Sequence, residues 1–253
     1  MKRTRVIILI FAVVLITGGL ILLLGKGHIS QKYLQKGILM LENEKYTESI
    51  VFFDKALKWN KKSPQAYLKK GIALFFQNEL PKANENIDAS LALDSLSAEA
   101  YLYKGMISNH EKNYPASVGF LSRALEIDSL LSQAFYQRGI AKAGLSDFKG
   151  SVEDYKKSLQ LDKNNVEIYK KSIEARSAID DYLGAINDYN KLIEMDSTNA
   201  EAYYNRGFFK INLSDNAGAV EDFTKAIKFN SDLTDAWYQR GLSFARLGKM
   251  IWP

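Results

Sequence analysis

Apolar side chains recur at helical spacing along most of the chain, in pairs of runs separated by short polar segments. In one pair, Tyr203, Gly207 and Ile211 fall on the first run, and Val220 and Phe223 fall on the second. Apolar positions three or four residues apart line one face of an α-helix. The polar segments carry residues that commonly start helices. The pattern therefore predicts an all-α chain of helical hairpins.

One phrase, AYYNRG at 202–207, returns with small changes at 66, 100, 134 and 236. Its closing glycine stands on a ladder with a spacing of 34 residues, formed by Gly37, Gly71, Gly105, Gly139, Gly207 and Gly241. The one departure is position 173, which is isoleucine. We call these seven positions the rungs. A single hairpin cannot bury its apolar face, so units of this length are expected to stack into a solenoid.

Other positions keep the same register. An aromatic residue stands four positions before each rung, at Tyr33, Tyr67, Tyr101, Phe135, Tyr169, Tyr203 and Trp237. Mostly small residues stand 12 and 19 positions after the rungs, at Ser49, Ala83, Ser117, Ser151, Ala185 and Ala219, and at Ala56, Ser90, Ala124, Ser158, Leu192 and Ala226. Small residues and the rung glycines predict the places where helices approach closely.

In this register an aromatic residue and a basic residue precede glycine in the first helix, and small and aromatic residues occur in the second helix. The pattern resembles the tetratricopeptide repeat. The resemblance covers residues 30–252 and implies a right-handed α-solenoid of stacked hairpins. The expected repeats span 30–63, 64–97, 98–131, 132–165, 166–199 and 200–233, with a half repeat at 234–253. The proline that usually closes a repeat is replaced by Lys or Ser after an Asn or Asp, which predicts Asx-type turns at 60, 94, 128, 162, 196 and 230.

The N-terminal residues follow a different pattern. Residues 6–24 are a 19-residue run without a charge, preceded by Lys2, Arg3 and Arg5. As a helix this run would span about 28 Å, close to the ~30 Å hydrocarbon core of a bilayer. We therefore expect residues 1–27 to form a basic head and one transmembrane anchor. A cleaved signal peptide is the alternative, although residues 24–28 supply no small-residue cleavage site.

Basic residues flank this run unequally, because Lys26 is the only one immediately after it. The positive-inside rule then places the N-terminus in the cytoplasm and residues 28–253 outside it, as expected for a bacterial inner-membrane protein facing the periplasm. Lys2, Arg3, Arg5 and Lys26 account for most of the net charge of +5. The remainder is nearly neutral, so the charge does not indicate a nucleic-acid partner.

The chain lacks the residues of the common catalytic and metal sites. It has no cysteine and two histidines, His28 and His110, which are far apart in the sequence. Neither a thiolate or histidine-rich metal site nor a serine triad can be assembled from them. Adjacent carboxylates such as Asp180 and Asp181 diverge on a helix instead of converging. The sequence predicts no enzyme, no cofactor and no metal site.

A basic residue precedes each rung glycine, at Lys36, Lys70, Lys104, Arg138, Arg206 and Arg240. These residues could form an anion-binding stripe or could pair with acids on neighbouring helices. The arginines occur where the second helices carry Asp154, Asp188 and Asp222. We favour ion pairs, and predict that at least two of the three arginines lie within salt-bridge distance of one of these aspartates.

In tetratricopeptide repeat proteins the first helices form a concave face, at positions three before, one after and four after the rung. The resemblance assigns to it Leu34, Ile38, Leu41, Leu68, Ile72, Phe75, Leu102, Met106, Asn109, Tyr136, Ile140, Ala143, Lys170, Glu174, Tyr204, Phe208, Ile211 and Tyr238. This largely apolar set suits an extended or helical peptide with apolar side chains. The alternative is that individual members pack against neighbouring helices.

The fifth repeat breaks the pattern at four positions, Ile168, Ser172, Ile173 and Glu174. Isoleucine in place of the rung glycine is expected to push helices apart and to change the superhelical geometry near 168–177. Lys170 and Glu174 interrupt the apolar face, either to set the register of a bound peptide or as tolerated drift. The carboxylate clamp of some family members is not carried over, because acidic and amide residues stand where its Asn, Lys and Arg are needed.

These features predict a non-enzymatic, membrane-anchored scaffold that binds a protein or peptide on the concave face, in envelope assembly, secretion or chaperoning of exported chains. A structural homo-oligomer and a regulatory sensor subunit of a separate enzyme are the alternatives. The half repeat ends in an apolar group, Leu242, Phe244, Leu247, Met250, Ile251 and Trp252. Terminal units usually present a polar outer face, so we expect an exposed patch for self-association or docking. A truncated piece of a longer array explains this ending equally well.

Overall fold

The computed structural model describes residues 25–248, and within them all regular secondary structure is helical. Residues 25–42 are helical, and the helices that follow are α2 Tyr46–Trp59, α3 Pro64–Phe76, α4 Leu80–Leu93, α5 Ala98–His110, α6 Tyr114–Ile127, α7 Ser132–Gly144, α8 Phe148–Leu161, α9 Val166–Ser177, α10 Tyr182–Met195, α11 Ala200–Asn212, α12 Asn216–Phe229 and α13 Thr234–Arg246. In this part of the chain no helix has the length and apolarity to cross a bilayer. The predicted span at 6–24 lies outside the described residues.

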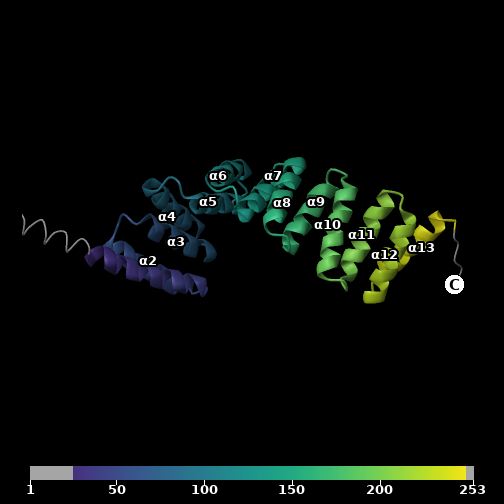
Figure 1. Ribbon diagram of the computed structural model, residues 1–253, viewed down its shortest axis with the longest axis horizontal. Helices are drawn as coiled ribbons and strands as arrows, with labels where there is room; N and C mark the ends of the chain where they lie inside the picture. The colour runs from purple at the N-terminus through teal and green to yellow at the C-terminus, as the bar shows by residue number, and fades with distance from the viewer. Residues whose placement is uncertain (1–24, 249–253) are drawn as a thin grey trace, which may run out of the picture. The chain divides into compact units, whose positions relative to one another are not determined.

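The chain divides into two compact units, which meet in sequence between Ile107 and Ser108. In the first unit, the buried core includes Leu34 against Phe53, and Leu68 and Ile72 beside Ile87. In the second unit, each helix from α6 to α13 packs against the next in chain order, and Figure 1 shows α7 to α13 side by side. The predicted all-α arrangement of stacked hairpins is confirmed within each unit.

Each turn inside a hairpin contains one residue with a left-handed backbone. These residues have φ between 58° and 63° and are Glu44, Asn78, Lys112, Ser146, Asp180 and Ser214. Each stands seven positions after a rung, and Gly248, with φ +68°, holds the same place after the last one. The left-handed conformation costs a residue other than glycine about 1–2 kcal/mol. Because most of these residues have no local preference for it, the turn is imposed by the rest of the fold and not by the turn residue itself.

The turns between repeats have the predicted Asx geometry at five positions. The side chains of Asn60, Asp94, Asp128, Asp196 and Asn230 each accept a hydrogen bond from the backbone N–H two residues later, at 2.9–3.1 Å. At Asp162 the carboxylate accepts a bond from the side-chain amide of Asn165 instead, at 2.8 Å. In these turns, which lack proline, hydrogen bonds to Asn and Asp side chains stabilise the connection between one hairpin and the next.

The rung glycines lie where the two helices of a hairpin touch. A Cβ atom on Gly37 would stand 2.5 Å from the Phe53 ring, and one on Gly139 would stand 2.5 Å from the Tyr155 ring. Both rings are almost completely buried. The predicted close approach is therefore confirmed at these two rungs, and in both hairpins the aromatic residue 16 positions later fills the space that a side chain would need.

Candidate functional site

Buried ion pairs hold the basic residue before the rung in repeats four and six. Arg138 donates to Asp154 from Nε to Oδ2 at 2.8 Å and from Nη2 to Oδ1 at 2.7 Å, and Lys142 Nζ lies 2.8 Å from Asp154. Arg206 and Asp222 form the same bidentate pair. Both aspartates are 1% exposed. The prediction that at least two of the arginines pair with these aspartates is confirmed.

The same basic position also links neighbouring hairpins. In the first unit, Lys70 Nζ lies 2.7 Å from Asp54 on the preceding second helix, and Lys104 Nζ lies 2.6 Å from Asp88. In the second unit, the third guanidinium nitrogen of Arg138, Nη1, donates to Ser122 at 3.0 Å. Because these cationic side chains already bond to other side chains of the protein, they connect stacked repeats instead of forming an anion-binding stripe.

In repeat five, different residues bond the corresponding aspartate of the second helix, Asp188. Ser172, which replaces the basic residue, donates to Asp188 Oδ2 at 2.6 Å. Arg176, one helical turn later, donates from Nε to the same oxygen at 2.9 Å and also bonds Asp181. Burial raises the pKa of Asp188, and the bonds from Ser172 and Arg176 oppose that rise. The arginine has in effect moved one turn along the first helix.

The rung isoleucine widens the fifth hairpin. Ile173 is 6% exposed and packs with Tyr169, Leu192 and Phe209 in one buried cluster. The backbones of α9 and α10 approach each other less closely than those of the hairpins that keep glycine, such as α7 with α8. The expected separation of the two helices is confirmed. The associated change in superhelical geometry stays a prediction.

A pocket of about 260 Å³ opens beside this widened hairpin. It is lined by the first helices α9 and α11 together with α10 and the turn before α11, through Lys170, Ile173, Glu174, Tyr189, Leu192, Asn199, Glu201, Ala202 and Asn205. Its walls are therefore apolar near Ile173 and Leu192 and polar at Glu174 and Glu201. Burial raises the pKa of Tyr189 to about 12, and the charges of Glu201 and Glu174 add to the rise. Lys171 Nζ lies 2.8 Å from Glu174 at the margin.

The structure separates the predicted concave-face residues into two groups. Leu34, Leu68, Ile72 and Leu102 are only 2–7% exposed and belong to the core of the first unit, so they are not available to a partner. For these four the alternative of packing between helices is correct. A helical period locates an apolar stripe but does not say whether a neighbouring helix or solvent lies against it.

The remaining predicted residues keep some accessible surface. Those that are half-buried are Ile38, Leu41, Phe75, Met106, Asn109, Tyr136, Ile140, Ala143, Tyr204 and Ile211. Phe208 and Tyr238 are 46% and 65% exposed, and Lys170 and Glu174 are also exposed. Of this set, the structure brings Lys170 and Glu174 together in the pocket, where the sequence did not identify Tyr189, Asn199, Glu201 or Asn205 as their companions.

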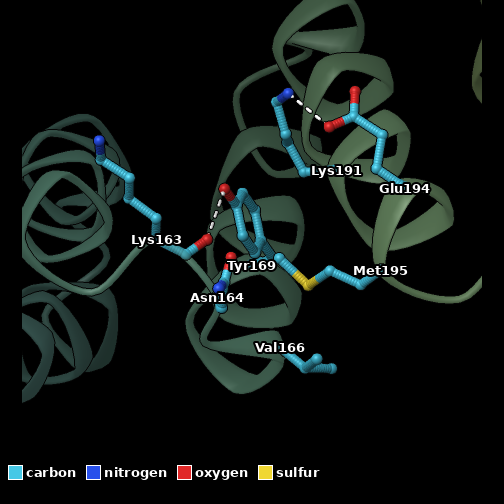
Figure 2. A pocket seen from close by; sticks show the side chains of 7 residues that line it. All are labelled: Lys163, Asn164, Val166, Tyr169, Lys191, Glu194 and Met195. Atoms are coloured by element: carbon cyan, nitrogen blue, oxygen red, sulfur yellow. Dashed lines mark hydrogen bonds and ion pairs between the residues drawn. The ribbon is translucent and has the colours of Figure 1, made fainter.

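A second hollow lies at the turn between α8 and α9. It has a volume of about 740 Å³ and is lined by Lys163, Asn164, Val166, Tyr169, Lys191, Glu194 and Met195. Figure 2 shows the Tyr169 ring between Lys163 on one side and Lys191 with Glu194 on the other. Tyr169 donates from its hydroxyl to the Lys163 carbonyl at 3.3 Å, and Lys191 Nζ lies 2.6 Å from Glu194.

An adjoining recess of about 340 Å³ is lined by Lys156 and Asp188. These residues stand 16 positions before and after Ser172. In repeat four, Arg138 reaches between the two equivalent residues, Ser122 and Asp154; in repeat five, Arg176 also lines the recess. The substitution at position 172 was the sequence signal that could have located it.

The half repeat is only partly described. Leu242 and Phe244 are half-buried and Leu247 is 37% exposed, whereas Met250, Ile251 and Trp252 lie outside the described residues. The exposed apolar patch therefore stays a prediction. Among the described residues, no group of three or more His, Asp or Glu side chains is placed to hold a metal ion.

Models of the tetratricopeptide repeat match three segments, residues 68–132, 179–212 and 200–233. Among curated proteins, none matches the sequence. YrrB, a tetratricopeptide repeat protein with an unusual peptide-binding site, is 25% identical over 74% of this chain and 96% of its own, with a TM-score of 0.64. Pseudomonas aeruginosa PilF is 19% identical over 86% of this chain and 99% of its own, with a TM-score of 0.67.

A tetratricopeptide repeat protein from Parabacteroides merdae is 16% identical over 85% of this chain and 84% of its own, with a TM-score of 0.55. At this identity it shares the fold with the present chain, as PilF does. The 34-residue register, the hairpins of both units, the matching repeat models and the similar solved structures agree. Residues 68–132 and 179–233 of this chain are therefore tetratricopeptide repeats.

Proposed function

We propose that this chain is a membrane-anchored scaffold that binds one segment of a partner protein on the face formed by its first helices. The repeats and the similar solved structures imply a protein–protein interaction scaffold. The proposal adds an anchor, at residues 6–24, and a binding site, at repeats five and six. The peptide-binding site of YrrB, which is 25% identical, supports a peptide segment as the ligand.

The pocket between α9 and α11 is the observation that carries the proposal. It is the place where polar side chains interrupt the first-helix face, and it joins an apolar floor at Ile173 to hydrogen-bonding groups at Glu174 and Asn205. Binding sites commonly combine apolar area with a few polar groups that fix orientation. Glu174 and Lys170 would set the register of the bound segment.

Exposed aromatic residues on later first helices extend this surface. Phe208 on α11 is 46% exposed and Tyr238 on α13 is 65% exposed. Fully burying an exposed side chain of this size contributes about 1.5–3 kcal/mol, and Phe208, which is already about half covered, would contribute roughly half of that. An apolar segment that starts at the pocket and continues along α11 would gain this energy.

Site-specific photo-crosslinking of the full chain in its native membrane tests the docking. One variant carries a photo-reactive amino acid at Phe208, and the matched variant carries it at Leu183, which is 64% exposed on the second helix α10. We expect one foreign protein to be crosslinked from position 208 and not from position 183. Adducts between two copies of the chain would favour the homo-oligomer, and equal labelling at both positions would remove the special role of the first-helix face.

The topology follows from the charge asymmetry around residues 6–24. If Lys2, Arg3 and Arg5 stay in the cytoplasm, the repeats face the periplasm, where exported chains and envelope proteins are the available partners. We therefore extend the proposal to envelope assembly, secretion or chaperoning. Alkaline phosphatase fused after residue 248 should be active if the topology is correct, and a fusion that is inactive although stably produced would contradict it.

A further inference from the structure

The recess between the second helices α8 and α10 is strongly basic. Its volume is about 340 Å³, and its walls come from α8, the turn that follows it, α9 and α10. The lining residues are Lys156, Leu159, Gln160, Lys163, Tyr169, Arg176, Asn187, Asp188 and Lys191. Four of these nine residues are cationic and one is anionic, so the lining has a formal net charge of +3.

The same nine positions of the repeat register have the opposite charge on either side of this recess. One repeat earlier, two positions are cationic and three are anionic, namely Lys142, Lys157, Glu126, Glu153 and Asp154. One repeat later, the charged residues are Lys210, Lys225, Glu194, Glu221 and Asp222. The net charge is −1 in both cases. The register by itself therefore does not produce a basic surface at these positions.

Four substitutions account for the whole difference, and each makes the lining more positive. Lys156 and Lys163 stand where the repeats before and after have Ser or Asn. Gln160 and Asn187 stand where both of those repeats have Glu. The four positions are spread over 32 residues of sequence, and the fold brings them to one recess.

The added lysines have no partner that would neutralise them. Among residues 25–248, neither Lys156 nor Lys163 has an acidic group within salt-bridge distance, and both are exposed. Lys191 Nζ lies 2.6 Å from Glu194, but both side chains are more than half exposed. An exposed pair of this kind contributes about 0–1 kcal/mol, so an anion can compete for Lys191.

The donors that remain suit phosphate better than carboxylate. A planar carboxylate is best bound by the fork of an arginine. The guanidinium of Arg176 is already used, because it bonds Asp188 at 2.9 Å and also bonds Asp181. The other donors of the lining are ammonium groups, which bind phosphate as point charges, and the side-chain amides of Gln160 and Asn187. A phosphate group offers up to two negative charges and three acceptor oxygens to these donors.

We propose that this recess binds a phosphate group, which accepts hydrogen bonds from the ammonium groups of Lys156, Lys163 and Lys191. Gln160 and Asn187 add amide donors where glutamate would repel the anion. The recognised chemistry is the same in a soluble phosphate ester and in a lipid headgroup that ends in a phosphate monoester. The recess shares no lining residue with the pocket between α9 and α11, so the inference does not rest on the proposed function.

Calorimetric titration of the full chain in mild detergent with inorganic pyrophosphate, at low ionic strength, tests this site. We expect saturable binding that weakens as salt is added, because the lysines are exposed. Lys156→Ser and Lys163→Ser each install the serine found one repeat earlier and should weaken binding roughly tenfold, since a charged hydrogen bond is lost. Lys149→Ser removes the same charge from an exposed site on α8 outside the recess and should leave the affinity unchanged.

A double variant reverses the charge of the lining without removing a lysine. Gln160→Glu combined with Asn187→Glu restores the acids of the repeats before and after, so the fold should tolerate it, and pyrophosphate binding should be lost. The inference is overturned if pyrophosphate does not bind the unchanged chain, or if its binding survives in the double variant. It is also overturned if Lys149→Ser weakens binding as much as Lys156→Ser does.

Two further ligands distinguish the sources of the phosphate. Glycerol phosphate and dihexanoyl phosphatidic acid carry the same phosphate monoester, and the second also carries acyl chains. Equal affinities that both fall in Lys156→Ser assign the recess to a soluble phosphate ester. Binding of the phosphatidic acid alone, with the same dependence on Lys156, assigns it to a lipid headgroup. Affinities that do not change in Lys156→Ser would contradict recognition of phosphate in the recess.

Discussion

A methyl group at Gly139 tests the packing of the hairpins most simply. The substitution Gly139→Ala places a Cβ atom 2.5 Å from Cε1 and 2.7 Å from Cδ1 of Tyr155. Tyr155 is 1% exposed, so the ring is enclosed by protein and cannot move aside into solvent without opening the core. The helices α7 and α8 must therefore separate, or the ring must leave its position.

Two opposing effects determine the size of the change. Replacing glycine by alanine inside a helix stabilises it by about 1 kcal/mol. Forcing an extra carbon into a filled core costs about 1–3 kcal/mol, and the short contact with a buried ring puts this site near the upper end. We therefore expect Gly139→Ala to lower the stability of the α7–α8 hairpin by about 2 kcal/mol.

The chain offers a matched control at Gly119, in the middle of α6 of the same unit. Nothing lies within 4 Å of a Cβ atom at this position, so Gly119→Ala should stabilise its helix by about 1 kcal/mol. Repeat proteins do not unfold as one cooperative unit, so the local opening free energy is the appropriate quantity. Native-state hydrogen exchange of the full chain measures it helix by helix.

The two variants should have opposite effects on exchange. In Gly139→Ala, amides of α7 and α8 should exchange roughly 30-fold faster, which corresponds to about 2 kcal/mol. In Gly119→Ala, amides of α6 should exchange more slowly. If Gly139→Ala slowed exchange as much as Gly119→Ala does, the close packing at the rung and the reasoning from it would be refuted.

Three further substitutions have defined outcomes. Asp154→Asn should cost the second unit about 3–5 kcal/mol in hydrogen exchange, because it leaves Arg138 without its charged partner, whereas the exposed Glu153→Gln should change little. Burial raises the pKa of Asp188 above its ordinary 3.8, so the folded state holds the proton more tightly. The stability contributed by Asp188 is therefore lower at neutral pH and rises as pH falls through the raised pKa. Urea unfolding of wild type and Asp188→Asn from about pH 7 to about pH 4 should show this trend as a difference in unfolding free energy between the two proteins. A difference with the opposite slope would contradict it. Lys112→Gly should raise the local opening free energy of the turn after α5 by about 0.5–1 kcal/mol, since φ is 59° there, and equal hydrogen exchange of this turn in both proteins would argue against backbone strain.

The period of the sequence was sufficient to predict the hairpins and several of their side-chain contacts. A strict spacing constrains many residues at once, so the Asx turns and the pairing of Arg138 with Asp154 followed from position alone. The burial of Leu68 and Leu102 did not follow, because the position that faces the concave side in one repeat can also face the next helix. Periodicity identifies the face of a helix but not what covers it.

Repeat five marks the limit of reasoning from the pattern. The sequence shows that Ser172 and Ile173 break the register, and the widened hairpin was a direct consequence of side-chain volume. The substitute role of Arg176 required the three-dimensional arrangement, since it depends on a side chain one turn away reaching Asp188. The pocket at Glu174 likewise combines residues from three helices and the turn before α11, and no local sequence motif indicates that these residues lie together.

The crosslink from Phe208 gives the most direct test of partner docking at repeats five and six when it is measured in two further variants of the full chain. Glu174→Leu changes a polar group of the pocket, and Glu153→Leu makes the same change on the second helix α8, outside it. The account predicts that the yield of the foreign-protein adduct falls roughly tenfold in Glu174→Leu, as expected when a charged hydrogen bond is lost, and stays unchanged in Glu153→Leu. An adduct yield that is the same in all three proteins would contradict binding at this pocket.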